Sequence, residues 1–294
     1  MSSVLQLITA ARRDLGDGFH VLRAVPTTAA RSVGPFVFVD HFGPTVLAPG
    51  KAMDVRPHPH IGLATVTYLF AGSIVHRDSL GTVQRIEPGA INWMTAGRGI
   101  VHSERTPEEL RAYEQSMHGM QIWIGLPEAV EEIQPSFLHT PADALPAREL
   151  EGVRVNVLLG RAFGLESPVP TFSDTLYCAL EVRPGATLAI AAEHAERALY
   201  VTEGALDVDG TRVNPGTLAV LAPAASVPIR AAADSPLTRA MLLGGAPLGH
   251  RFVWWNFVSS RRERIEQAKA DWAAQRLGHV IGEPTGEFIP LPEH

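Results

Sequence analysis

The stretch from residue 64 to residue 70 reads Ala64-Thr65-Val66-Thr67-Tyr68-Leu69-Phe70, an apolar run rich in β-branched and aromatic side chains. Two similar runs are Met120-Gln121-Ile122-Trp123-Ile124 and Leu176-Tyr177-Cys178-Ala179-Leu180-Glu181-Val182. Glycine (26 residues) and proline (23 residues) separate such runs along the whole chain. Short apolar runs with turn residues between them are typical of β-sandwiches and β-barrels. The sequence therefore predicts an all-β fold.

The two halves of the chain repeat one pattern of strand and turn. Tyr68-Leu69-Phe70-Ala71-Gly72 is followed by Pro88-Gly89, and Tyr200-Val201-Thr202-Glu203-Gly204 is followed by Pro215-Gly216. A repeat of roughly 130 residues is long enough for one small β-barrel. We therefore predict two tandem jelly-roll-like β-barrels.

The division into domains follows from this repeat and from local composition. The predicted N-terminal domain covers residues 1–130, and the C-terminal domain covers residues 151–246. Residues 131–150 are predicted to be a connector because this region is richer in proline and charge. Residues 247–294 form a predicted tail.

The tail contains one segment with the pattern of an amphipathic helix. Ser260 and Glu263 have the spacing of a capping box. Apolar side chains then recur at roughly helical intervals, at Ile265, Ala268, Trp272 and Leu277. We expect this helix to pack its apolar face on a barrel.

Charge and cysteine content exclude several classes of function. The formal net charge is 25 − 31 = −6, which disfavours direct binding to nucleic acid. A single cysteine, Cys178, cannot form an internal disulfide, and we expect it to be a small buried hydrophobic residue. The longest stretch without Asp, Glu, Lys or Arg, residues 57–76, holds three histidines and two prolines, so no membrane span is predicted. The expected location is the cytoplasm.

The sequence that points most sharply to chemistry is Arg56-Pro57-His58-Pro59-His60, followed by Gly97-Arg98-Gly99-Ile100-Val101-His102-Ser103-Glu104. Residues i and i+2 of a strand point to the same face. His58 and His60 therefore project together, and so do His102 and Glu104. If the two strands meet inside one barrel, three imidazoles and one carboxylate converge.

Such a set suits one divalent transition metal per chain. Imidazole binds Zn, Cu, Fe and Ni, whereas a carboxylate shifts the preference toward Fe(II) or Mn(II). We therefore favour Fe(II), with Mn, Ni, Cu and Zn left open. The sequence does not give the coordination number.

The same residues carry a family resemblance, because the sequence resembles the pirin family of bicupin proteins in the cupin superfamily. The motifs that match are Gly34-Pro35-Phe36, Asp40-His41-Phe42-Gly43-Pro44, His58-Pro59-His60, the stretch from Trp93 to Glu104, His118-Gly119-Met120-Gln121-Ile122-Trp123, Trp255-Asn256-Phe257-Val258 and the closing Gly286-Glu287-Phe288-Ile289-Pro290-Leu291-Pro292.

The resemblance implies two cupin barrels with a metal, commonly iron, in the N-terminal one. It also implies that His58, His60, His102 and Glu104 are the metal ligands. Some members of the family open a flavonol ring with O₂ and release carbon monoxide, and others act through protein partners. Cupins often carry a glutamate where this chain has Ala64, which could alter the surroundings of the ligands.

The predicted function is a quercetin 2,3-dioxygenase-like reaction on a flavonol or a similar phenolic chelator, with O₂ as second substrate. Glu104 is the candidate catalytic residue, as acceptor of the substrate proton. Asp40 and Gln121 are candidates for contacts with the substrate or the ligands. The alternative is a non-catalytic redox or metal sensor, or an adaptor, that binds a regulatory protein partner. A purely structural metal is a third reading.

The second barrel lacks an equivalent ligand set. Its nearest remnant is His194-Ala195-Glu196, and the stretch Ala222-Pro223-Ala224-Ala225-Ser226 stands where a second pair is wanted. We therefore predict a barrel without metal. His41, His76 and His118 could line the pocket, but we favour structural histidines.

Overall fold

The computed structural model describes residues 2–14, 20–284 and 286–293. The chain divides into two compact units. Unit 1 comprises Met1–His41 and Asp143–Pro247, and unit 2 comprises Phe42–Ala142 and Leu248–His294. The units are therefore interleaved along the chain, because unit 1 takes in the first 41 residues as well as residues 143–247.

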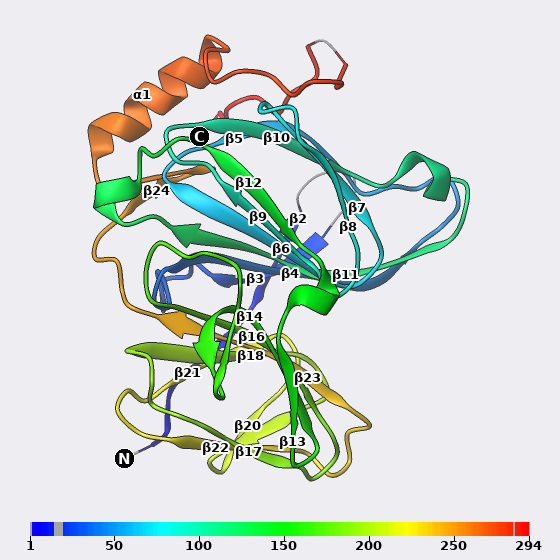
Figure 1. The fold of residues 1–294 in the computed structure, drawn as a ribbon, viewed down its shortest axis with the longest axis vertical. Coiled ribbons are helices and arrows are strands. Elements are labelled where there is room, and N and C mark those ends of the chain that lie inside the picture. Colours follow the sequence, from blue (N-terminus) through cyan, green and yellow to red (C-terminus); the bar gives the residue numbers. More distant parts are fainter. Residues whose placement is uncertain (1, 15–19, 285, 294) are drawn as a thin grey trace. The chain divides into compact units, whose positions relative to one another are not determined.

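Unit 2 is built around two antiparallel sheets, and β4 is the strand at which one unit passes into the other. The larger sheet has the order β12 (Ser136–Thr140), β9 (Ile91–Thr95), β6 (Leu63–Ala71), β11 (Gln115–Gly125) and β4 (Phe36–Leu47), of which the residues from Phe42 on belong to unit 2. β3 (His20–Val25) and β2 (Ala11–Asp14), which pair with each other, belong to unit 1. The smaller sheet has the order β5 (Asp54–His60), β10 (Ile100–Arg105), β7 (Ile74–Asp78) and β8 (Val83–Ile86). β5 and β10 run side by side (Figure 1).

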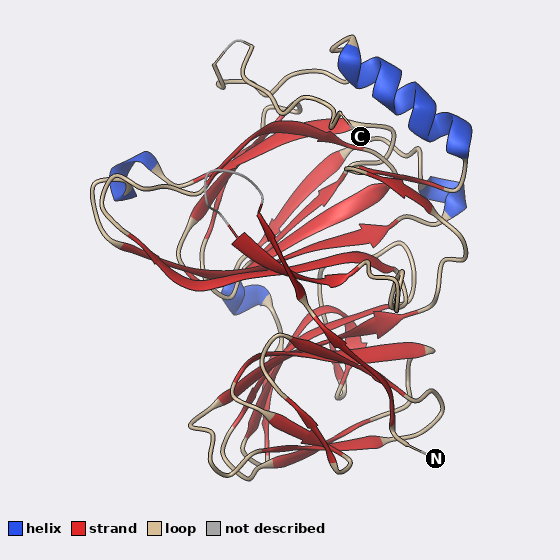
Figure 2. Ribbon diagram, turned by 180° about the vertical axis from the view of Figure 1, so that it is seen from behind, coloured by secondary structure: helices blue, strands red, loops and turns tan. Residues whose placement is uncertain are grey.

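Unit 1 repeats this arrangement. Its larger sheet has the order β1 (Val4–Thr9), β21 (Thr217–Leu221), β18 (Glu196–Glu203), β23 (Thr238–Gly245), β16 (Thr175–Val182), β14 (Val153–Ala162) and β13 (Ala147–Leu150), with β15 (Leu165–Glu166) paired to β14. Its smaller sheet has the order β17 (Thr187–Ile190), β22 (Val227–Ala231), β19 (Leu206–Val208) and β20 (Thr211–Val213). The predicted all-β fold with two barrels is confirmed, and strands dominate the chain in Figure 2.

The matching strand orders explain why the units are interleaved. β1, from the start of the chain, pairs with β21 at the edge of the unit 1 sheet. β12 occupies the corresponding place beside β9 in unit 2. The interval predicted as a connector, residues 131–150, thus contains β12 and β13, and both are hydrogen-bonded strands.

Three short 3₁₀ helices, one hairpin and one α-helix complete the regular structure of the described residues. Their bounds are η1 (Glu108–Leu110), η2 (Glu128–Val130), η3 (Ala142–Ala144), β24 (Phe252–Trp254), β25 (Phe257–Ser259) and α1 (Arg262–Ala273). Among the described residues, no helix is both long and apolar enough to cross a membrane. Cys178 is fully buried in the core of unit 1, as expected.

The predicted C-terminal helix is confirmed as α1, but its predicted capping box is wrong. The N-cap residue is Arg261, and no side chain caps the helix there. The Ser260 hydroxyl instead donates a hydrogen bond of 2.7 Å to Glu131. The start of α1 is therefore fixed by this contact and by tertiary packing, and not by a capping side chain.

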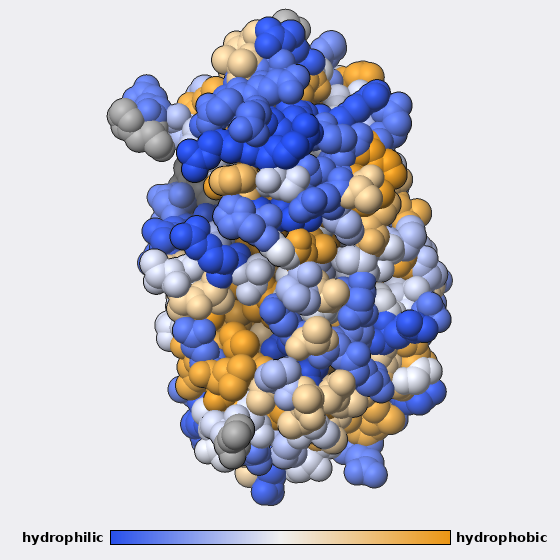
Figure 3. All heavy atoms as spheres, turned by 90° about the vertical axis from the view of Figure 1, so that its left-hand side faces the viewer, coloured by the Kyte–Doolittle hydropathy of each residue, from blue (hydrophilic) through white to orange (hydrophobic). Residues whose placement is uncertain are grey.

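The apolar face of α1 packs within unit 2. Ile265, Ala268 and Trp272 join Ile61, Val101 and Phe257 in one buried cluster. On the face where α1 lies, hydrophilic side chains predominate in the upper part of the view, which contains α1 (Figure 3). The helix is thus amphipathic, as predicted.

Candidate metal centre

The two strands that carry the predicted ligands, β5 and β10, are direct neighbours in the smaller sheet of unit 2. In the register of β5 with β10, His102 lies opposite His58 and Ile100 lies opposite His60. A bulge follows between His102 and Glu104. Because alternate residues share a face, this pairing directs both histidines of β5 and His102 of β10 to the same side.

The three histidines form a compact buried cluster. The donor atoms of His58, His60 and His102 lie within 4.8 Å of one another. The closest pair is His60 Nε2 and His102 Nε2, which are 3.1 Å apart. The structure therefore brings together the three imidazoles that the sequence singled out.

Backbone carbonyls fix the tautomers of the two histidines on β5. His58 Nδ1 is 2.8 Å from the carbonyl oxygen of Arg56, and His60 Nδ1 is 3.2 Å from that of Asn256. A carbonyl oxygen can only accept, so each Nδ1 carries the proton and donates it. The Nε2 atom of each neutral ring then keeps a lone pair, as a metal ligand must.

The third histidine is fixed by a chain of side chains. Asp78 accepts a hydrogen bond of 3.1 Å from His76 Nε2, which leaves His76 Nδ1 as an acceptor when that ring is neutral. His102 Nδ1 lies 3.3 Å from this atom and donates to it. His102 Nε2 thus also keeps a lone pair, facing His60.

Burial keeps these rings neutral. It lowers the pKa of His58 to about 4, and it lowers the pKa of His60 and His102 well below the usual value, with neighbouring histidines adding to the effect. Burial acts to raise the pKa of Asp78, but hydrogen bonds from His76 and Thr82 outweigh it and hold that pKa below its usual value. At neutral pH the centre therefore holds three neutral imidazoles, and the ionised carboxylate of Asp78 lies behind His76.

Glu104 lies on the other side of His102. Its carboxylate forms a second group with His76 and His102, and the donor atoms of this group also lie within 4.8 Å of one another. Burial raises the pKa of Glu104. The predicted set of four is thus arranged as two groups that share His102.

A polar contact on β6 links Glu104 to Gln121. The Thr67 hydroxyl is 3.2 Å from Glu104 Oε1 and 2.8 Å from Gln121 Oε1. Gln121 therefore lies in the neighbourhood predicted for it. Ala64, on the same strand, is fully buried.

Asp40 has a different environment, in unit 1. Arg23 donates two hydrogen bonds to its carboxylate, of 2.8 and 2.7 Å. Burial raises the pKa of Asp40, and the charge of Arg23 opposes that shift. Both carboxylate oxygens of Asp40 are thus engaged by one guanidinium.

Neither His76 nor Asp78 was predicted to contact a ligand histidine. A structural role was favoured for His76, yet this ring contacts His102 directly. The signal was present, because His76-Arg77-Asp78 is a third pair of polar residues with strand spacing. The Asn256 carbonyl carries no such signal, since any residue supplies a backbone oxygen.

The second barrel has aliphatic side chains at the equivalent positions. In the register of β17 with β22, Leu188 lies opposite Ile229 and Ile190 lies opposite Val227. Leu188, Ile190 and Ile229 thus correspond to His58, His60 and His102, and Ala231 follows at the position of Glu104. Ile190 and Ile229 are buried in the apolar core.

The predicted remnant His194-Ala195-Glu196 lies outside this register. His194 Nδ1 is 3.0 Å from Asp174, and its Nε2 is 2.9 Å from the Arg161 carbonyl oxygen. The strand equivalent to β10 is β22, which spans Val227–Ala231. Residues 222–226, where a second ligand pair was expected, come directly before this strand.

Two barrels of one strand order, with a buried polar cluster in one and an aliphatic core in the other, define a bicupin. Three neutral imidazoles whose Nε2 lone pairs converge beside a carboxylate fit a divalent transition metal.

Comparison with known proteins places the chain more narrowly. The pirin family model matches residues 18–124, and the pirin C-terminal cupin domain matches residues 177–278. A pirin-like protein of Caulobacter vibrioides is 51% identical over 287 residues, which cover 97% of this chain and 98% of that protein. The chain belongs to the pirin family.

Two solved structures extend this comparison. A quercetin 2,3-dioxygenase from Acinetobacter baumannii is 31% identical, with a TM-score of 0.89 over 99% of this chain and 97% of that one. The bacterial pirin YhhW from Escherichia coli, solved in complex with nickel(II), is 19% identical, with a TM-score of 0.63 over 82% of this chain and 99% of that one. The latter likeness concerns the fold alone.

Proposed function

We propose that this chain is a mononuclear metal-dependent dioxygenase of the quercetin 2,3-dioxygenase type, acting on a flavonol or a similar phenolic chelator. The observation that carries the proposal is the convergence of His58, His60 and His102, each held through Nδ1 so that Nε2 is available. The buried carboxyl group of Glu104 beside His102 supplies a candidate proton acceptor, which a purely structural metal would not need.

The relatives support this choice of reaction. The Acinetobacter baumannii structure is named as a quercetin 2,3-dioxygenase, and it matches almost the whole chain. The Escherichia coli pirin, which shares the fold, has been solved in complex with nickel(II). Among divalent transition metals we favour Fe(II), because a carboxylate accompanies the imidazoles. Mn, Ni, Cu and Zn are the alternatives.

In the proposed reaction, His58, His60 and His102 would hold the ion, and Glu104, the fourth predicted ligand, would join them until it accepts the substrate proton. When bound, the metal supplies Lewis acidity toward a deprotonated phenol and access to O₂ chemistry. Glu104 takes the proton of the substrate hydroxyl at a carboxylate oxygen, and the Thr67 hydroxyl can donate a hydrogen bond to that carboxylate. The buried walls exclude water from the developing phenolate.

A flavonol assay tests the proposal. The protein loaded with Fe(II) is mixed with quercetin, and the loss of flavonol absorbance is followed with and without air while carbon monoxide is measured. We expect O₂-dependent loss with carbon monoxide formed in proportion. His60→Ala should abolish turnover, and His194→Ala, on the unrelated histidine of unit 1, should retain it.

Two results would contradict the proposal. Turnover that persists after the metal is stripped would show that the cluster is not the reaction centre. No turnover in the fully loaded protein, together with partner binding that differs between the ferrous and ferric forms, would favour the sensor or adaptor.

A further inference from the structure

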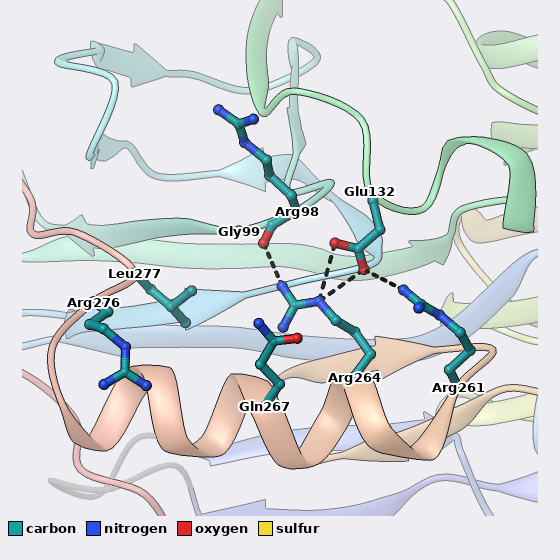
Figure 4. A pocket seen from close by; sticks show the side chains of 8 residues that line it. All are labelled: Arg98, Gly99, Glu132, Arg261, Arg264, Gln267, Arg276 and Leu277. Carbon is teal, nitrogen blue, oxygen red and sulfur yellow. Dashed lines mark hydrogen bonds and ion pairs between the residues drawn. The ribbon is translucent and has the colours of Figure 1, made fainter.

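We propose that a pocket between α1 and the turn from β9 to β10 binds a small phosphate ester through its phosphate group. The pocket belongs to unit 2 and has a volume of about 440 Å³. It is lined by Arg98, Gly99, Glu132, Arg261, Arg264, Gln267, Arg276 and Leu277 (Figure 4). This proposal is separate from the dioxygenase function and does not depend on it.

The centre of the pocket is a buried guanidinium that is incompletely satisfied. The Arg264 side chain is 8% exposed. Its Nε donates to both oxygens of Glu132, at 2.9 and 3.1 Å, and its Nη2 donates to the Arg98 carbonyl oxygen at 2.7 Å. Within the described chain, its buried Nη1 has no hydrogen-bond partner.

The Nη1 atom of Arg264 needs a hydrogen-bond acceptor. A buried N–H group without one loses its hydration and gains nothing in return. Figure 4 shows Arg264 Nη1 turned toward Gln267 and the helix side of the pocket. An oxygen of a bound anion would satisfy it and would add a charge-assisted hydrogen bond.

The remaining arginines surround this point. Arg261 lies 3.7 Å from Glu132, and its side chain is 60% exposed. Arg276 pairs with Asp271, and its side chain is 59% exposed. Arg98 and Arg276 extend to opposite sides of the pocket, so their long side chains can fold inward over a ligand (Figure 4).

The charge of the pocket is opposite to that of the chain. The lining has four arginines and one glutamate, so its charge is 4 − 1 = +3, whereas the chain carries −6. Glu131 and Asp271 pair with lining arginines from outside, and counting both still leaves +1. A positive pocket in a negative protein concentrates anions.

Phosphate fits this arrangement better than a carboxylate does. Its several oxygens can accept from Arg264 and from the rim arginines at the same time, whereas a carboxylate is satisfied by one guanidinium fork. Leu277 is the one aliphatic side chain in the lining, which disfavours a largely apolar ligand. The pocket also exceeds the size of a single phosphate, which leaves room for an ester group.

Titration calorimetry at low ionic strength tests the proposal on the metal-loaded protein. The probes are inorganic phosphate and glycerol 3-phosphate, and we expect the ester to bind more tightly. Arg264→Lys keeps a positive charge near Glu132 but removes Nη1. The double variant Arg98→Ala/Arg276→Ala alters only exposed side chains. Each should weaken ester binding at least about tenfold.

Two controls separate this pocket from other sites. Arg183→Ala removes an arginine of unit 1 whose side chain is 70% exposed, and it should leave the affinity unchanged. Metal-free wild type should also bind the ester with unchanged affinity, because the phosphate does not bind at the metal centre. Equal affinity in wild type and in both pocket variants would overturn the proposal. So would loss of binding in metal-free wild type, or equal affinity for inorganic phosphate and the ester.

Discussion

The Nδ1 atom of His102 lies 3.3 Å from the Nδ1 atom of His76, and this contact sets which nitrogen of His102 faces the other ligands. Asp78 holds the opposite nitrogen of His76, so the proton positions along the chain of three residues follow from one carboxylate. Supporting hydrogen bonds of this kind orient metal-binding imidazoles and tune their affinity. His76 is therefore a positioning residue for the metal centre.

Replacing His76 tests that role. His76→Phe preserves a ring that can stack on Phe137, as His76 does at a centroid distance of 4.5 Å, but it offers no acceptor to His102. We expect metal affinity to fall ~10–100-fold. His76→Gln supplies an amide oxygen and should restore most of the affinity. Competition with a chelator measures both, and equal affinities in the two variants would contradict the positioning role.

Trp272 should stabilise unit 2 without touching the metal centre. Its side chain is 1% exposed, and its Nε1 donates to the Ile289 carbonyl oxygen at 3.0 Å. Trp272→Ala should lower the free energy of unfolding by ~3–5 kcal/mol, the usual effect of removing a buried large aromatic. Trp272→Phe should cost less because it keeps much of the packing.

Urea denaturation measures the Trp272 variants, with metal content recorded on the folded protein. The metal content should stay as in wild type. An unchanged unfolding midpoint in Trp272→Ala would mean that α1 contributes little to the fold.

The stability of the metal-free protein should fall as the pH falls from about 6.5 toward 4. Burial lowers the pKa of His58 to about 4, so between these values the unfolded chain binds more protons than the folded one. The loss from His58 alone is about 3 kcal/mol over that window. Glu104 acts in the opposite sense, because burial raises its pKa.

The contribution of His58 is therefore measured as a difference. Urea unfolding of wild type and of His58→Phe is compared from pH 7.5 to pH 4, both without metal. Wild type should lose more stability on acidification than the variant does. Parallel curves would show that His58 is not held as a neutral ring.

Sequence spacing predicted the ligand cluster because strand geometry is regular. His58 and His60 are two residues apart on one strand, as are His102 and Glu104 on the next. The alternation of side chains along a strand therefore placed each pair on one face. The same reasoning could have added His76 and Asp78. Strand spacing could not predict the contact between His60 and the Asn256 carbonyl oxygen, because the two residues are 196 positions apart in the sequence.

Register explains the errors in the second barrel. His194 was chosen for its residue type, whereas the strand pairing assigns the equivalent positions to Leu188, Ile190 and Ile229. Because these residues are aliphatic, nothing in a single sequence indicates that their positions correspond to ligand positions in the other barrel. The interleaved units were equally hidden, because the pairing of β1 with β21 joins residues more than 200 positions apart.

The central claim is that His58, His60 and His102 hold one metal ion, and metal content after dialysis tests it most directly. Wild type, His58→Ala, His102→Ala and His194→Ala are loaded, dialysed and analysed by elemental mass spectrometry. We predict about one ion per chain in wild type and in His194→Ala, and roughly a tenth of that or less in the other two, since even supporting residues change affinity ~10–100-fold. Full occupancy in both His58→Ala and His102→Ala would contradict the account.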